Sequence, residues 1–126
     1  MHIPSPYKAT FALLWALCLP LTASAHAFPV RSRPQVGAHL KAAPHHIRIW
    51  FDSGLEALFS SLTVKNTHNQ VVSEGHGHVA AGSHNRLLET TVGTLPPGLY
   101  HVYWSVIAVD GHHTHGHYMF RIQPSA

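Results

Sequence analysis

The feature that most constrains the fold is a series of short segments in which apolar and polar residues alternate. Alternation with a period of two is typical of strands with one buried face. The longest such segment spans 99–109, and the residues expected on its buried face, with Trp104 near the centre of the core, are Tyr100, Val102, Trp104 and Val106. Further strands are predicted at 47–51, 61–65, 87–92 and 117–122, and an extended edge segment at 28–36. Turn residues separate them and no convincing amphipathic helix is present, so the pattern predicts an all-β sandwich of about seven strands.

Composition narrows the functional classes. The chain has 126 residues, which suits one domain. Only 10% of the residues are charged, whereas there are 14 histidines. The eight Lys and Arg residues are scattered and form no basic run, so despite the net charge of +3 we expect no nucleic-acid partner.

Residues 1–25 have the pattern of a cleavable signal peptide. Lys8 provides a positive charge, 11–21 are mostly apolar, and Ala23-Ser24-Ala25 fits a small-x-small cleavage site. An uncleaved membrane anchor is the alternative, but the apolar run is shorter than the roughly 20 residues needed to span a bilayer. We therefore expect export to the periplasm and a mature domain at 26–126 without membrane insertion. Cys18, the single cysteine, would be removed, which excludes thiolate ligands.

The stretch 109–117 holds four histidines and one aspartate. Imidazole and carboxylate groups are ligands that copper, zinc and nickel accept. In an extended backbone, Asp110 and His112 would point the same way and could reach one ion, although Gly111 and Gly116 favour a turn equally. A continuing strand would place a separate row on the opposite face: His113, His115 and His117.

Cleavage after Ala25 would make His26 the first residue. Its free amine and its imidazole Nδ1 could then chelate one metal ion. Together with Asp110 and His112 they form a nitrogen-rich set suited to tetragonal Cu(II). The alternatives are a coincidental N-terminal histidine, a turn-capping aspartate and an exposed loop histidine. His76 and His78, in a glycine-rich loop, are expected to be solvated, with a secondary metal site as the alternative.

The chain resembles the CopC family of periplasmic copper-resistance proteins over essentially all of 26–126. The matching residues are, in order, His26-Ala27-Phe28, Ser32-x-Pro34-x-x-Gly37-x-x-Leu40, Pro44 before the strand at 47–51, Leu95-Pro96-Pro97-Gly98-x-Tyr100-x-Val102-x-Trp104, and Asp110-Gly111-His112 followed by Gly116. The resemblance implies an immunoglobulin-like Greek-key β-sandwich. It also implies a Cu(II) site built from the N-terminal histidine and the Asp-x-His pair, here His26, Asp110 and His112.

Two departures from the family pattern bear on chemistry. Some members also hold Cu(I) in a methionine-rich loop, whereas the only methionine after residue 25 is Met119, so Cu(I) ligation is not expected. Many members place a glutamate near the copper after the second strand. Here the nearest carboxylate is that of Asp52, which is one residue away from the family position. In an extended strand its side chain would therefore point to the opposite face.

These observations predict a periplasmic protein that binds Cu(II) and sequesters it or hands it on, without catalysing a reaction. Its partners would be the copper ion and, for delivery, a membrane copper transporter; the sequence leaves delivery and storage open. A histidine-brace copper oxidase or monooxygenase is one alternative, although about 100 residues leave little room for a substrate surface. A general zinc or nickel module is the other.

Overall fold

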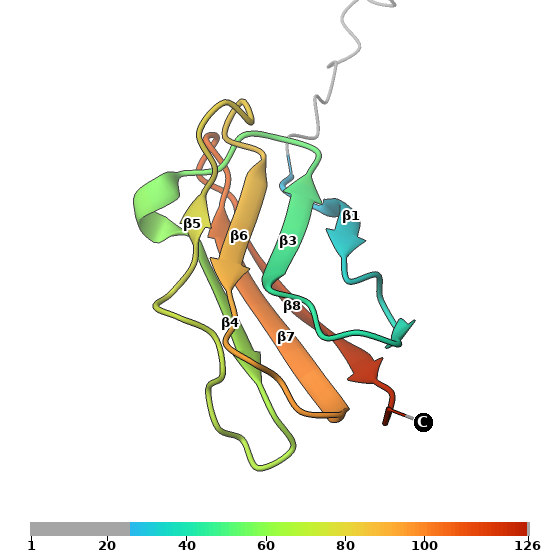
Figure 1. Ribbon diagram of the computed structural model, residues 1–126. Helices are drawn as coiled ribbons and strands as arrows, with labels where there is room; N and C mark the ends of the chain where they lie inside the picture. The colour runs from blue at the N-terminus through green and yellow to red at the C-terminus, as the bar shows by residue number, and fades with distance from the viewer. Residues whose placement is uncertain (1–25, 126) are drawn as a thin grey trace, which may run out of the picture.

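The computed structural model describes residues 26–125, so the predicted signal peptide lies outside the described residues. Two four-stranded sheets pack face to face (Figure 1). In chain order the elements are β1 (Pro29–Arg33), β2 (His39–Leu40), β3 (His46–Phe51), the 3-10 helix η1 (Ala57–Phe59), β4 (Ser61–Lys65), β5 (His78–Val79), β6 (Leu87–Thr91), β7 (Gly98–Ile107) and β8 (His113–Ile122). No helix within 26–125 is long and apolar enough to cross a membrane.

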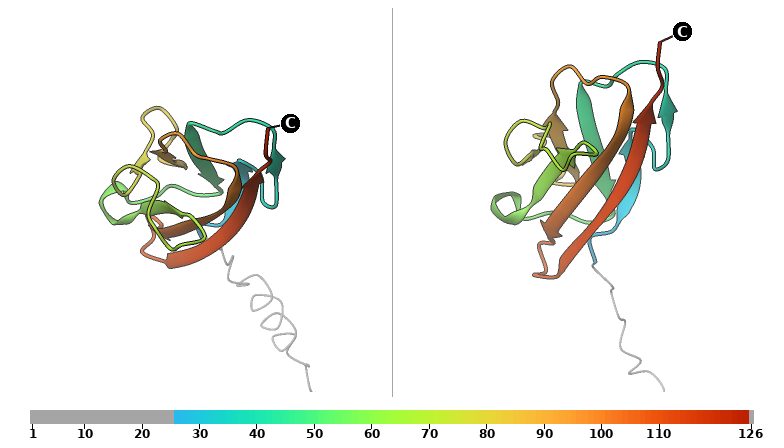
Figure 2. Two further views of the ribbon diagram at one scale, coloured as in Figure 1. Left: turned by 60° about the horizontal axis from the view of Figure 1, so that its bottom comes forward. Right: turned by 90° about the horizontal axis from the view of Figure 1, so that it is seen from below.

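One sheet has the strand order β1-β3-β6-β5 and the other has the order β2-β8-β7-β4. Figure 2 shows the two layers, with β7 and β8 side by side along most of their length. The prediction of an all-β, immunoglobulin-like sandwich is confirmed. The segment at 28–36 does form an edge strand, because β1 pairs only with β3.

The alternation seen in the sequence accounts for the core. In β3, Ile47, Ile49 and Phe51 are buried, while Arg48 and Trp50 face outward. Burying an aliphatic or aromatic side chain of this size contributes about 1.5–3 kcal/mol, so such residues fix which face of each strand turns inward. The remaining core residues come from both sheets and form one cluster.

The expectation that Trp104 lies near the centre of the core is wrong. Its side chain is only partly buried and packs on the core edge, with its ring edge-to-face against Phe51 at 5.4 Å. Trp104 pairs with Gly116 across β7 and β8, and the indole occupies the space that a side chain at Gly116 would fill. A cavity of about 250 Å³ lies beside the indole and is lined in part by Trp104, Pro29 and Val36.

Strand β8 is also longer than expected. It begins at His113 instead of residue 117, and β7 ends at Ile107. The histidines of this stretch alternate with Thr114 and Gly116, which turn inward, so the strand period continues through the polar segment. Gly116 therefore lies within a strand and not in a turn.

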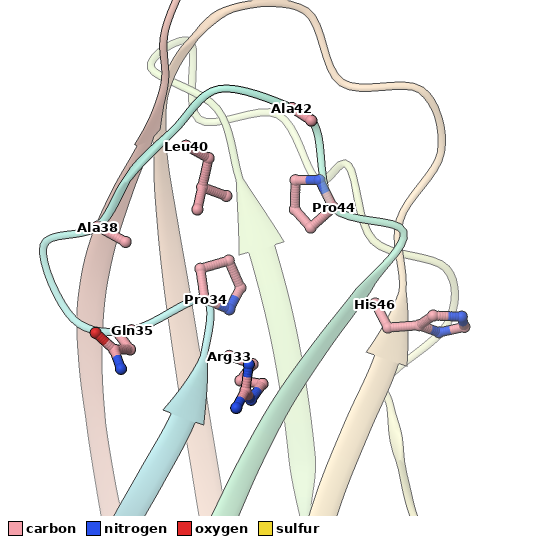
Figure 3. A pocket seen from close by; sticks show the side chains of 8 residues that line it. All are labelled: Arg33, Pro34, Gln35, Ala38, Leu40, Ala42, Pro44 and His46. Carbon is pink, nitrogen blue, oxygen red and sulfur yellow. The ribbon is translucent and has the colours of Figure 1, made fainter.

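A second cavity, of about 390 Å³, lies beside β2 and the start of β3 (Figure 3). Small and apolar side chains line most of it, and His46 is the one histidine among its lining residues. His46 begins β3, whereas Phe51 ends it beside the N-terminal segment, so this cavity lies at the opposite end of the sandwich from His26.

Candidate metal centre

The turn between β7 and β8 brings Asp110 and His112 together. The Ala108 amide donates to the His112 carbonyl at 2.9 Å, and the Gly111 amide donates to the Ala108 carbonyl at 2.8 Å. Gly111 has φ +91°, a conformation that residues with a Cβ rarely adopt. The Asp110 carboxylate accepts the His112 amide at 3.1 Å, as short polar side chains do in turns. Thus the two side chains converge through a turn, and not through the extended backbone that the sequence also allowed.

Asp110 also fixes the His112 ring. Its Oδ2 lies 2.9 Å from His112 Nδ1. The hydrogen bond from the His112 amide, followed by that of the ring, holds the pKa of the Asp110 carboxyl below its usual range. An ionised carboxylate can only accept hydrogen bonds, so Nδ1 carries the proton and the lone pair of His112 is on Nε2. This carboxylate-to-imidazole arrangement is the one that orients metal-binding histidines.

The N-terminal segment is held by three hydrogen bonds, one at Ala27, which is fully buried, and two at Phe28. The Thr114 hydroxyl donates to the Ala27 carbonyl at 2.7 Å. The Phe28 amide donates to the Asp52 carboxylate at 2.9 Å, and the Asp52 amide donates to the Phe28 carbonyl at 2.9 Å. Asp52 therefore anchors the residues after His26, a role different from the carboxylate near the metal that the family pattern suggested.

Sequence reasoning missed Thr114. The four histidines around Thr114 were the candidate metal ligands of the stretch 109–117, and a turn there was as strongly favoured as a strand. The available signal was strand parity, because an even-numbered residue of β8 shares the inward face with Tyr118 and Phe120. A hydroxyl on that face is expected to find a backbone partner.

These contacts place the His26 ring beside the His112 ring. The ring centres lie 4.6 Å apart and the planes meet at 86°. An imidazole nitrogen binds a first-row metal at about 2.0 Å, and the ring centre lies about 1.2 Å behind that nitrogen. Two imidazoles whose bonds to one ion meet at about 90° therefore have ring centres about 4.5 Å apart. The spacing of His26 and His112 thus fits two neighbouring positions of one coordination sphere.

The site is open to solvent. The side chain of His112 is 57% exposed and that of Asp110 is 28% exposed. Within residues 26–125, no three His, Cys, Asp or Glu side chains are positioned to share a metal ion. The structure therefore brings two imidazole rings together, with the Asp110 carboxylate hydrogen-bonded to one of them.

The two histidines for which a secondary metal site was the alternative, His76 and His78, lie elsewhere. His78 Nε2 lies 3.1 Å from the Glu89 carboxylate, which also pairs with Arg48 at 3.0 Å. His76 lies in the preceding loop, where its carbonyl accepts the Leu62 amide. Neither His76 nor His78, which begins β5, is brought to His26 and His112.

The fold and this site define a small immunoglobulin-like β-sandwich with an imidazole pair at one end of its two sheets. The family model described as the CopC domain matches residues 29–123. The chain belongs to the CopC family.

Two relatives from the sequence comparison illustrate the range of the family. Protein YobA of Escherichia coli (strain K12) is 32% identical over 99 residues, which cover 79% of this chain and 80% of YobA. The copper transport protein CutJ of Bacillus subtilis (strain 168) is 30% identical over 110 residues, which cover 87% of this chain. The match spans only 20% of CutJ, so it concerns one part of a larger protein.

Solved structures agree with this membership. CopC from Methylosinus trichosporium OB3b superposes with a TM-score of 0.69 at 27% identity, over 80% of this chain and 97% of that one. PcoC from Escherichia coli, described as a methionine-rich copper resistance protein, superposes with a TM-score of 0.66 at 28% identity, over 79% of this chain and all of that one. The present sequence contains only two methionines, so it shares the fold of PcoC without its richness in methionine.

Proposed function

We propose that this protein is exported to the periplasm and binds one Cu(II) ion, which it sequesters or passes on. The observation that carries the proposal is the pairing of the His26 and His112 rings at 4.6 Å and 86°. Membership of the CopC family supports copper as the cargo. The proposal includes removal of residues 1–25, since this step creates the amine of His26.

In this proposal, His26 contributes its amine and its Nδ1, and His112 contributes Nε2. The amine exists only once the chain begins at His26, so it adds a donor that side chains alone do not provide. Three nitrogen donors favour Cu(II) over Zn(II) by the usual affinity order of first-row ions. Met119, the one methionine after residue 25, faces outward from β8 and stays away from the site.

Asp110 is the remaining member of the proposed site. Its carboxylate holds the His112 ring with Nε2 free, and its negative charge offsets part of the charge of the ion. In the alternative in which Asp110 itself binds the ion, its side chain would have to rotate and give up its hydrogen bonds to His112. Substitution of Asp110 should therefore change both the orientation of His112 and the copper environment.

The N-terminal chelate can be tested by adding one residue before His26. The extra peptide bond removes the free amine and leaves every side chain in place. We expect Cu(II) affinity, measured against a competing chelator, to fall about a hundredfold, because the chelate ring is lost. The control is the chain from His26 with one residue added after Ala126. Equal affinities for the two chains would remove the amine from the proposed site.

Proton competition provides a second measure of the same site. The amine and both imidazoles must be deprotonated to bind the ion. We therefore expect Cu(II) affinity to decrease as the pH falls from about 8, where the amine begins to be protonated, and most steeply below about 6. If Cu(II) affinity did not change between about pH 5 and about pH 8, imidazole ligation would be contradicted.

A further inference from the structure

The outer face of the β2-β8-β7-β4 sheet carries a second group of histidines. Every other residue of β8 points away from the core, and these outward residues are exposed. The first three form the outer histidine row: His113, His115 and His117. His112, one residue before the row, belongs instead to the turn that faces His26.

Two members of the row have a geometry that suits one metal ion. The ring centres of His113 and His115 lie 5.8 Å apart, with planes tilted by 44°. With about 3.2 Å from ring centre to metal, two imidazoles on one ion have centres about 4.5 Å apart at right angles and about 6.4 Å apart when opposite. The observed spacing falls inside that interval, so the two ring centres are already as close together as those of two imidazoles on one ion.

The backbone beneath this pair is firmly held. His113 pairs with Ile107 and His115 pairs with Ser105 in the continuous β7 and β8 ladder. Both facing residues are uncharged, so no cation lies directly opposite the pair. The Ser105 hydroxyl lies 2.8 Å from His113 Nε2, which holds that ring above the sheet and leaves Nδ1 of His113 free.

His117 is engaged differently. Its ring stacks on Tyr103 at 5.3 Å with planes 16° apart, and on His101 at 6.1 Å with planes 24° apart. Near-parallel stacked rings direct their nitrogen lone pairs along separate planes, whereas a shared ion needs lone pairs that converge. The stack of His101, Tyr103 and His117 is therefore an aromatic cluster beside the His113 and His115 pair.

We propose that His113 and His115 form a second, open binding site for a nitrogen-preferring divalent ion such as Zn(II), Ni(II) or Cu(II). Two imidazoles bind the ion and water fills the other positions, so the site is weaker than one with a chelating amine. Between the two histidines, Thr114 points inward to Ala27, on the side of the sheet that holds His26. The second site therefore lies across the sheet from the first and does not depend on the proposed Cu(II) site.

The test uses Zn(II), which is diamagnetic, and the ¹⁵N-labelled chain beginning at His26. Long-range ¹H–¹⁵N spectra identify each imidazole nitrogen that binds the ion. We expect nitrogens of His113 and His115 to shift together with the same midpoint, both in the natural sequence and in His112→Ala. In His115→Ala, the midpoint for His113 should rise at least about tenfold, because one of two linked donors is gone.

His68 serves as the matched control, since it is an exposed histidine in the turn after β4. His68→Ala should leave the midpoint for His113 and His115 unchanged. Shifts of His113 and His115 that are no larger than that of His68, or a midpoint unaffected by His115→Ala, would overturn the second site. Loss of Cu(II) binding to His26 and His112 would instead count against the proposed function alone, so the two failures are distinguishable.

Discussion

Thr114→Val tests how the fold places His26. The substitution removes the hydroxyl that donates to the Ala27 carbonyl at 2.7 Å and keeps the branched shape of the side chain. A typical hydrogen bond contributes about 1 kcal/mol net, and a buried carbonyl left without a partner costs about 1–3 kcal/mol. Ala27 is fully buried, so the free energy of unfolding should fall by about 1–3 kcal/mol.

The same loss should reach the copper site, because Ala27 directly follows His26. About 1.4 kcal/mol corresponds to a tenfold change in a binding constant. If the N-terminal segment is released and must be ordered again for copper to bind, a cost of about 1 kcal/mol lowers Cu(II) affinity about fivefold. Urea unfolding and chelator competition on the chain beginning at His26 measure the two effects. Thr63→Val is the control, since Thr63 lies on the outer face of β4 opposite Tyr103. Undiminished Cu(II) affinity in Thr114→Val would refute the role assigned to this contact.

Three further substitutions test the packing and electrostatics around the site. Gly116→Ala would place a Cβ 2.6 Å from Trp104 Cζ2. The free energy of unfolding in urea should therefore fall by about 1–3 kcal/mol, and tryptophan fluorescence should change. An unchanged unfolding midpoint would contradict the close contact. Burial raises the pKa of Tyr118 to about 12, so its neutral form contributes stability below pH 10 that is lost as the pH rises towards 12, by about 2–3 kcal/mol. Tyr118→Phe should lack that component of the alkaline loss, and equal pH profiles for the two proteins would exclude it. Asp52→Ala removes the acceptor of the Phe28 amide and should lower both stability, by about 1 kcal/mol, and Cu(II) affinity; an effect on neither would show that Thr114 alone holds the segment.

The Tyr118 hydroxyl is a notable polar group in the core. It is buried and has no hydrogen bond of acceptable geometry among the described residues. The Ser32 side chain lies close enough to lower the pKa slightly, yet burial dominates and the pKa rises. Replacement by phenylalanine should therefore cost little or nothing at neutral pH, since an unpaired polar group is removed.

Much of the fold follows from local alternation. The predicted strand at 61–65 coincides with β4, and the inward positions of β3 are those expected from Ile47, Ile49 and Phe51. A period of two identifies a buried face without any knowledge of the partner strand. This is why an all-β sandwich could be predicted from the sequence.

The rest depends on pairing across the chain, which local patterns do not contain. The half-exposed position of Trp104 results from its register with Gly116, which places the indole over a glycine at the edge of the core. The contact of Thr114 with Ala27 joins residues 87 positions apart. The approach of His26 to His112 is equally non-local. Their donor chemistry suggested that they share one ion, but only the family resemblance implied that the fold brings them together. By contrast, Gly111 and Asp110 did signal the turn that brings Asp110 to His112.

The most direct test of the central claim is electron paramagnetic resonance of the chain beginning at His26, loaded with one equivalent of Cu(II). His112→Ala and Asp110→Ala are measured under the same conditions. The account predicts a single nitrogen-rich tetragonal signal that changes in both variants, because His112 supplies a ligand and Asp110 fixes its ring. A heterogeneous signal that is indifferent to both substitutions would place the copper on scattered histidines and contradict the proposed site.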